Sequence, residues 1–288
     1  MASQNRRSNL RAILDGERSV ALATVFDPIS SRFAEHLGFE AGLVGGSIVS
    51  HVVLGAPDVI VLTLTELAEQ VHRCTRASRV PLVIDGDHGY GNALSVMRTV
   101  HELDAAGAAG IMIEDTLLPR PYGPSETAQL LSFDESVGKI AAAVKARGDS
   151  DVVVFGRTSA ATIAGADEAI ARFKAYEAEG VDALMMPGLK SRDDLDRIAA
   201  ATTLPLLVGG IAPALLDVDY LASRRVRLWS GGHQTFNVAV QALFAAMQAV
   251  QAGTPAPSLP SAAGKEVMNV ATGAADYDAW TAQFLGGK

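Results

Sequence analysis

The chain has 288 residues, of which 49% are hydrophobic and 19% charged, and its formal net charge is −8 at pH 7. This acidic balance excludes the basic surface that nucleic-acid binding needs, although a local cluster of cations can still bind a small anion. No apolar run has the length of a membrane span or a signal peptide, and the single cysteine, Cys74, excludes an internal disulfide. We therefore predict a cytoplasmic protein that acts on neither nucleic acid nor membranes.

Eight short apolar runs recur along the chain, each followed by a polar or glycine-rich turn and a segment with helical spacing of apolar residues. Several runs show no alternation of apolar and polar residues, as expected for parallel strands covered on both faces. The predicted strands are 20–25, 41–44, 81–84, 110–113, 152–155, 183–186, 205–208 and 226–229, and the predicted helices include 28–37, 92–106, 133–146, 166–179, 191–200 and 213–223.

This alternation predicts an α/β fold, a (β/α)8 TIM barrel, and a doubly wound parallel sheet is the alternative. We assign residues 1–252 to a barrel catalytic domain and residues 253–288 to a C-terminal helical arm. The composition shifts there to Pro, Ser and Gly before a last amphipathic piece at 277–285. Such an arm can pack on its own barrel, cross to a neighbouring subunit, or form a mobile tail.

Carboxylates follow three of the predicted strands, and in a barrel such residues meet on one surface. Asp85 and Asp87 follow the third strand, Glu114 follows the fourth, and Asp58 comes after a turn beyond the second. Carboxylates gathered at one mouth repel each other unless a cation lies among them. Oxygen ligands without thiolates favour Mg²⁺ or Mn²⁺. We predict one or two direct ligands, with Asp85 as the preferred one, and binding through water by the remaining carboxylates.

Groups suited to binding an anion occur at the same predicted end of the barrel. Arg157 follows the fifth strand, and its planar guanidinium can hold a carboxylate through two hydrogen bonds. Gly46 and Ser47 offer backbone N–H groups and a hydroxyl to an oxyanion. His233 can bind the far end of a substrate or relay a proton. Together they predict a site for a metal-chelating 2-oxo acid, with Ser47, Arg157 and His233 as catalytic residues.

Each of these assignments has a structural alternative. Asp85 and Asp87 can cap the following helix, Arg157 can form a structural ion pair with Glu114, and His233 can cap the last helix. Their coincidence at the predicted strand ends favours the functional interpretation.

Some glycine and histidine residues carry weaker signals. The sequence Gly89-Tyr90-Gly91 lacks the third glycine of a dinucleotide fingerprint, so a nicotinamide cofactor is not expected. Glycine pairs at 209–210 and 231–232 leave a phosphorylated substrate as an alternative. His88 is expected either to line the mouth or to shape the turn. We interpret the remaining histidines as surface or packing residues, namely His36, His51, His72 and His101.

Five motifs together resemble the isocitrate lyase and phosphoenolpyruvate mutase superfamily. They are "GGS" at 45–47, "APD" at 56–58, "DGDHGYGNA" at 85–93, "GIMIEDTLLP" at 110–119 and "GRT" at 156–158. With "MRTV" and the late "GGH", the chain is most similar to the oxaloacetate decarboxylase branch. The resemblance implies Mg²⁺ as cofactor and a homotetramer in which the last helix is exchanged between subunits. It also implies direct metal binding by Asp85, water-mediated support from Asp58, Asp87 and Glu114, and substrate contacts from Ser47, Arg157 and His233.

The loop after the fourth strand separates the activities within this superfamily. Lyases that this chain resembles carry cysteine and histidine there, whereas "DTLLPRPYGPSET" has neither, and mutases carry lysine where Thr116 stands. The resemblance therefore implies decarboxylation of oxaloacetate, or a closely related 2-oxo diacid, to pyruvate and CO2 through an enolate. The alternatives are a carbon–carbon lyase of the methylisocitrate or dimethylmalate type, phosphonopyruvate or phosphoenolpyruvate chemistry, and a barrel that only binds a ligand.

Two positions depart from the pattern of related decarboxylases. Some relatives carry a tyrosine after the seventh strand, where this chain has Gly209-Gly210. The role of that hydroxyl is therefore either absent here or supplied by another residue, with Tyr90 and Tyr122 as the candidates. Ser159 stands where many relatives carry Asp or Asn. These departures leave open a different 2-oxo or 2-hydroxy diacid as substrate.

Overall fold

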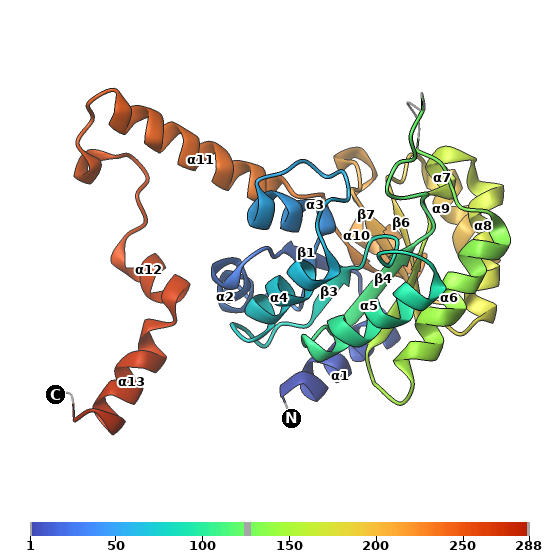
Figure 1. The fold of residues 1–288 in the computed structure, drawn as a ribbon, viewed down its shortest axis with the longest axis horizontal. Coiled ribbons are helices and arrows are strands. Elements are labelled where there is room, and N and C mark those ends of the chain that lie inside the picture. The colour runs from blue at the N-terminus through green and yellow to red at the C-terminus, as the bar shows by residue number, and fades with distance from the viewer. Residues whose placement is uncertain (1, 124–127, 287–288) are drawn as a thin grey trace.

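A computed structural model describes residues 2–123 and 128–286 as a closed barrel of parallel strands (Figure 1). Each strand pairs with the next along the chain, and β8 closes the barrel against β1. This topology confirms the predicted (β/α)8 barrel and rules out the doubly wound sheet. The strands are β1 (Val20–Thr24), β2 (Ala41–Val44), β3 (Leu82–Asp85), β4 (Gly110–Glu114), β5 (Val153–Arg157), β6 (Ala183–Pro187), β7 (Leu206–Gly209) and β8 (Val226–Trp229).

Helices follow the strands as predicted, with one correction. The predicted helix 213–223 is wrong as a single element, because Asp217 is extended (φ −141°) and its side chain accepts a hydrogen bond from the Tyr220 N–H, which starts a new helix. The longer helices are α1 (Ala2–Asp15), α2 (Pro28–His36), α4 (Leu64–Thr75), α5 (Ala93–Ala105), α6 (Phe133–Arg147), α8 (Ala166–Ala178), α9 (Arg192–Ala201), α11 (Gln234–Gln251) and α13 (Ala274–Phe284). The shorter ones are α3 (Gly46–Val49), η1 (Ser50–Leu54), α7 (Ala160–Ile163), η2 (Pro213–Leu215), α10 (Val218–Ser223), η3 (Ala256–Ser258) and α12 (Lys265–Thr272).

The interior of the barrel is filled by alternate strand residues, because successive side chains of a strand point to opposite faces. Val83, Met112 and Phe155 belong to this inner cluster, and Leu10 and Leu14 of α1 extend it. The helix α1 lies under the barrel in Figure 1. It therefore closes the amino-terminal end of the interior with apolar side chains.

The same alternation sets the direction of the polar residues at the carboxyl ends of the strands. Asp85, Glu114 and Arg157 each lie two residues beyond an inner core residue of the same strand, so they continue the inward-facing rows. Asp115 directly follows Glu114, Thr158 directly follows Arg157, and the Thr158 hydroxyl donates to Asp115. Asp115 also accepts hydrogen bonds from Arg172 and Tyr176 of α8, which lies behind the strands. Two polar clusters therefore arise on opposite faces of the same strand ends.

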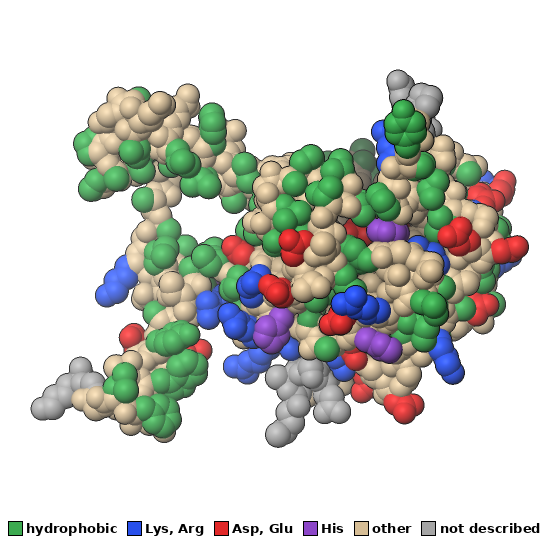
Figure 2. All heavy atoms as spheres, viewed as in Figure 1, with side chains coloured by type: hydrophobic (Ala, Val, Ile, Leu, Met, Phe, Trp, Pro, Cys, Tyr) green, Lys and Arg blue, Asp and Glu red, His purple; other side chains and the backbone are tan. Residues whose placement is uncertain are grey.

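The helix α11 extends away from the barrel and leads into the C-terminal arm (Figure 1). None of the residues 234–251 of α11 is buried, and Figure 2 shows hydrophobic side chains along the arm. The chain then returns, because Arg32 Nη1 of α2 donates to the Ala271 carbonyl of α12 at 3.2 Å. The proposed division into 1–252 and 253–288 stays a prediction. Among the described residues, no helix has the length and apolar character that crossing a membrane requires.

Candidate functional site

Asp85, Glu114 and Arg157 form one cluster at the carboxyl ends of β3, β4 and β5. Arg157 Nη1 donates to both carboxylate oxygens of Asp85, at 2.6 Å to Oδ1 and 2.7 Å to Oδ2. Arg157 Nη2 lies 3.2 Å from Glu114 Oε2, which also accepts a 2.9 Å hydrogen bond from the Thr116 hydroxyl. The alternative ion pair between Arg157 and Glu114 is therefore present, but Asp85 shares the same guanidinium.

Asp87 joins this cluster from the loop between β3 and α5. Its N–H donates to Asp85 Oδ1 at 3.2 Å, and its Oδ2 accepts a 3.1 Å hydrogen bond from the Tyr90 hydroxyl. The backbone of Asp87 is left-handed (φ 47°), and the residue is only 7% exposed. The alternative in which Asp85 or Asp87 caps the next helix is wrong. Asn92 occupies that position, and its side chain accepts hydrogen bonds from the first turn of α5.

The turn after β2 approaches both Asp87 and His233 closely, and glycine makes this possible. A Cβ atom at Gly45 would stand 2.7 Å from His233 Nε2, and one at Gly46 would collide with the Asp87 carboxylate. Ser47 follows directly and is half-buried in the first turn of α3. The predicted oxyanion turn therefore lies beside the acidic cluster.

His51 and Asp58 lie between β2 and α4, and both interact electrostatically with His233. Burial raises the pKa of Asp58, as does the nearby charge of Asp85, while the two histidines oppose the shift. Burial lowers the pKa of His233 against the opposing effect of Asp85. His51 stacks on Phe236 of α11, with ring centroids 5.8 Å apart. The sequence interpretation of His51 as a surface or packing residue therefore missed its position beside Asp58 and His233.

His233 itself stands at the N-cap position of α11, where its side chain makes no capping hydrogen bond. Within residues 2–123 and 128–286, its buried Nδ1 has no hydrogen-bond partner. Helix capping by the His233 side chain, the alternative considered above, is therefore wrong. The imidazole is left available for another partner.

The acidic cluster holds more negative charge than its one arginine can neutralise. Burial raises the pKa of Asp87 well above its usual value, and the charges of Asp85 and Glu114 raise it further. Burial also raises the pKa of Glu114, with Arg157 opposing. Burial by itself would lower the pKa of Arg157, but the surrounding carboxylates raise it above its usual value. The cluster is therefore suited to binding a cation.

The donor set fits a hard divalent cation. Asp58, Asp85, Asp87 and Glu114 offer only carboxylate oxygens, which Mg²⁺ and Mn²⁺ prefer. Across the described ranges, no three side chains of His, Cys, Asp or Glu are arranged to hold one metal ion together. A cation here would therefore take most of its ligands from water or substrate, which is usual for Mg²⁺.

A pocket of about 400 Å³ opens against this cluster. The pocket is not lined by any of the three predicted catalytic residues, Ser47, Arg157 and His233. Residues 124–127 of the loop between β4 and α6 lie outside the described residues. The acidic floor is Asp87 and Glu114, the apolar wall is Val59, Ile60, Leu117, Leu118 and Pro121, and the remaining lining is Asp58, Thr116, Arg120, Ala128, Gln129 and Ser159.

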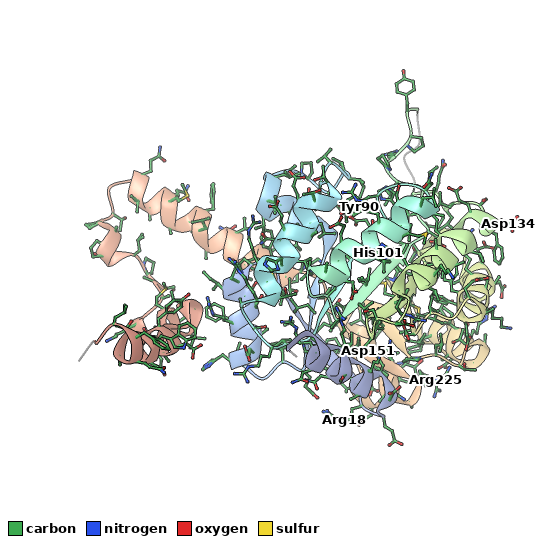
Figure 3. All side chains as sticks on the ribbon, turned by 60° about the horizontal axis from the view of Figure 1, so that its bottom comes forward. Arg18, Tyr90, His101, Asp134, Asp151 and Arg225 are labelled. Atoms are coloured by element: carbon green, nitrogen blue, oxygen red, sulfur yellow. The ribbon has the colours of Figure 1, made fainter. Side chains whose placement is uncertain are left out.

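The two tyrosines and His88, whose roles were open, differ in position. Tyr90 lies in the loop between β3 and α5 (Figure 3), where its hydroxyl donates to Asp87, whereas Tyr122 is fully exposed. His88 is 5% exposed, its ring centroid lies 5.7 Å from that of Tyr90, and burial lowers its pKa to about 4. It lines a separate pocket beside Arg98 and not the acidic one. Of the two candidate hydroxyls, only that of Tyr90 reaches the acidic cluster.

Comparison with known families and sequences gives matches over nearly the whole chain. The family described as phosphoenolpyruvate phosphomutase matches residues 10–251. An oxaloacetate decarboxylase of Paraburkholderia xenovorans (strain LB400) is 62% identical over 282 residues, which cover 98% of this chain and 94% of the relative. An oxaloacetate decarboxylase of Rhodopseudomonas palustris (strain BisB18) is 52% identical over the full length of both chains.

Solved structures with similar folds have related chemistry. Oxaloacetate acetylhydrolase bound to the inhibitor 3,3-difluorooxalacetate has a TM-score of 0.85 and 26% identity, covering 99% of this chain and 98% of its own. Phosphonopyruvate hydrolase bound to oxalate and Mg²⁺ has a TM-score of 0.85 and 28% identity, covering 97% and 99%. For 2,3-dimethylmalate lyase the TM-score is 0.84 and the identity 25%, covering 98% and 99%.

Proposed function

Because this chain belongs to the phosphoenolpyruvate mutase and isocitrate lyase superfamily, we propose that it decarboxylates oxaloacetate to pyruvate and CO2. The observation that carries the proposal is the carboxylate cluster that shares the guanidinium of Arg157 and presents Asp87 and Glu114 to a partly apolar pocket. Full-length relatives at 62% and 52% identity are named for this reaction. The absence of cysteine and histidine from the sequence 115–127 disfavours the lyase alternative, and Thr116 disfavours the mutase alternative.

The chain's own residues divide into metal-holding and substrate-holding groups. Asp85 would hold Mg²⁺ or Mn²⁺ directly, and Asp58, Asp87 and Glu114 would hold it through water. When bound, the metal would act as a Lewis acid and polarise the 2-oxo group of the substrate. This assignment is supported by the raised pKa values of Asp87 and Glu114. Burial raises both, the charge of Asp85 raises them further, and a bound cation would offset that repulsion.

Arg157 and the turn after β2 would hold the 2-oxo carboxylate end of the substrate. Arg157 keeps a spare donor, because its buried Nε has no hydrogen-bond partner in the described part of the chain. Gly46 and Ser47 supply backbone N–H groups and a hydroxyl nearby. These donors would stabilise the negative charge that develops on the enolate oxygen in the transition state.

The apolar wall of the pocket suits the carboxylate that leaves. Breaking the bond between C3 and C4 releases CO2, and the bond electrons form the enolate of pyruvate. A carboxylate has its charge dispersed as it becomes CO2, so a wall of Val59, Ile60 and Leu117 favours the product over the anion. Protonation of C3 by solvent then gives pyruvate, so no acidic loop residue is required. His233 would contact the substrate at the side of the turn at Gly45.

The test is a Mg²⁺-dependent assay for pyruvate with oxaloacetate as substrate, corrected for spontaneous decarboxylation without enzyme. Wild type should form pyruvate and CO2, and Arg157→Ala should lose at least about a hundredfold in kcat/KM. Arg18→Ala is the matched control. Arg18 pairs with Glu40 at the opposite end of the barrel, far from Tyr90 in Figure 3, and should retain activity.

The products separate the alternatives. Oxalate and acetate would indicate hydrolysis, as the name of one structural neighbour describes. A 2-oxo acid formed from a 2-hydroxy diacid would indicate a carbon–carbon lyase, and phosphorus NMR would detect turnover of phosphonopyruvate. If none of these substrates is turned over, the barrel is a binding protein and the proposal is wrong.

We also propose a cytoplasmic homo-oligomer in which α11 and the arm that follows it contact another subunit, with a homotetramer as the expected state. An exposed apolar stripe at helical spacing on α11 supports this, namely Val240, Leu243, Phe244 and Met247. The variant Leu243→Glu should therefore lower the mass measured by light scattering after size exclusion. An unchanged mass would contradict this role for α11.

A further inference from the structure

The second polar cluster, on the outer face of β4 and β5, is not used by the proposed mechanism. Asp115 Oδ2 accepts three hydrogen bonds, from Thr158 Oγ1 at 2.7 Å, Arg172 Nη1 at 2.9 Å and Tyr176 OH at 2.7 Å. Asp115 is 1% exposed and Arg172 is 4% exposed. A buried ion pair of this kind is weak support for overall stability, so its presence here suggests another role.

Two residues of the outer cluster are the direct chain neighbours of two residues of the inner cluster. Asp115 follows Glu114 on β4, and Thr158 follows Arg157 on β5. The hydrogen bond between Asp115 and Thr158 therefore parallels, on the outer face, the contact between Glu114 and Arg157 on the inner face. Because the backbone between neighbours is short and stiff, a shift of the outer pair moves the inner pair as well.

Arg172 also bonds the end of the loop between β4 and α6, which supplies Leu117, Leu118 and Pro121 to the pocket wall. Its Nη2 donates to the Leu131 carbonyl at 2.9 Å, and its Nη1 lies 3.1 Å from the Ser136 hydroxyl. The Leu131 N–H in turn donates to the Asp115 carbonyl at 2.8 Å. A second bond at 2.8 Å, from the Leu117 N–H to the Gln129 carbonyl, closes the base of the loop. One guanidinium therefore bonds both β4 and the returning end of the loop.

We propose that Arg172 is a positioning residue, which acts through Asp115 to hold Glu114, Arg157 and the part of the pocket wall that follows β4 in their relative places. Arginine suits this task because its fork donates in several fixed directions at once, which lysine cannot do. Displacing reacting groups by about 1 Å can cost a hundredfold in rate. This inference rests on the proposed function for its kinetic consequence, but its structural consequence can be measured independently.

The experiment compares Arg172→Met and Arg172→Lys with Arg147→Met. Arg147 is also partly buried and pairs with Asp182 at 2.6 Å, but it lies at the end of α6, beside the amino-terminal ends of the strands. We expect both Arg172 variants to lose about 10- to 100-fold in kcat/KM for oxaloacetate and in affinity for oxalate with Mg²⁺. Arg147→Met should change kcat/KM and oxalate affinity by less than about threefold, even if this variant is less stable than wild type.

Hydrogen exchange supplies a readout that does not depend on activity. In Arg172→Met, peptides that contain the Leu117 and Leu131 amides should exchange at least about tenfold faster, while the strand amides stay protected. Unchanged exchange at these amides together with unchanged kinetics would overturn the inference. If wild type fails to decarboxylate oxaloacetate, the proposed function is wrong. The positioning role is then decided by two other measurements, hydrogen exchange at the Leu117 and Leu131 amides and the affinity for oxalate with Mg²⁺.

A second pair of variants covers the case in which loss of Arg172 prevents folding. Thr158→Val removes the donor to Asp115 with little change of volume, and Thr158→Ser retains the hydroxyl. We expect Thr158→Val to lower kcat/KM by about tenfold and Thr158→Ser to restore it to within about threefold. Equal activity of the two Thr158 variants would overturn the inference.

Discussion

The two polar clusters at the ends of β4 and β5 differ in how their charges are compensated. On the inner face, Glu114 and its neighbours share the single guanidinium of Arg157, and burial raises the pKa of Glu114. On the outer face, Asp115 is matched by Arg172 and two hydroxyl donors, and no side opens to the pocket. The uncompensated cluster has the properties of a binding site, whereas the compensated one has those of a structural support.

The largest expected effect is that of Asp85→Ala on the inner cluster. Loss of the proposed direct ligand should lower Mg²⁺ affinity and kcat/KM by at least about a thousandfold, the upper end of what one electrostatic group contributes. Isothermal titration with Mg²⁺ and the pyruvate assay measure the two effects. Asp196→Ala, on the exposed face of α9, should change neither, and unchanged Mg²⁺ affinity in Asp85→Ala would refute the metal assignment.

The next effect concerns stability and the outer cluster. Asp115→Asn leaves the buried guanidinium of Arg172 without its charge partner, so the free energy of unfolding should fall by about 3 kcal/mol. Urea denaturation followed by circular dichroism measures this change. Asp167→Asn removes an exposed partner of Arg197 and should cost less than about 0.5 kcal/mol. Equal costs for the two variants would show that burial does not distinguish these pairs.

A third prediction uses the raised pKa values of Asp87 and Glu114 in the metal-free chain. A carboxyl whose pKa is higher in the folded state contributes stability below its usual pKa, and this contribution is lost as the pH rises through the folded-state value. Mg²⁺ competes with protons for the same oxygens. The increase in Tm caused by Mg²⁺ should therefore be larger at about pH 8 than at about pH 5. Equal shifts at both pH values would mean that these carboxyls do not bind the ion.

The smallest expected effect is that of Tyr176→Phe. This change removes one of three hydrogen bonds to Asp115 and leaves its ion pair with Arg172 intact, so the free energy of unfolding should fall by about 1 kcal/mol. The value of kcat/KM should stay within about threefold of wild type in the pyruvate assay. A larger loss of activity would assign Tyr176 a direct part in positioning the inner cluster.

Strand-end residues were the part of the site most accessible from sequence. Asp85, Glu114 and Arg157 could be predicted to meet because each directly ends a strand, and a parallel barrel brings those ends to one mouth. Thr116 and His51 were not predicted as neighbours of the cluster. Their sequence positions carry no periodic signal, and their places depend on loop conformation and on the packing of α11.

The sequence by itself determined the barrel, the order of its strands and the acidic character of its mouth, because hydrophobic periodicity and strand alternation are local properties. Only the tertiary structure decided that Arg157 is shared between Asp85 and Glu114, and that Arg172 reaches Asp115 from 57 residues away. These contacts join side chains of different elements, so they exist only once helix packing has set the distances between them.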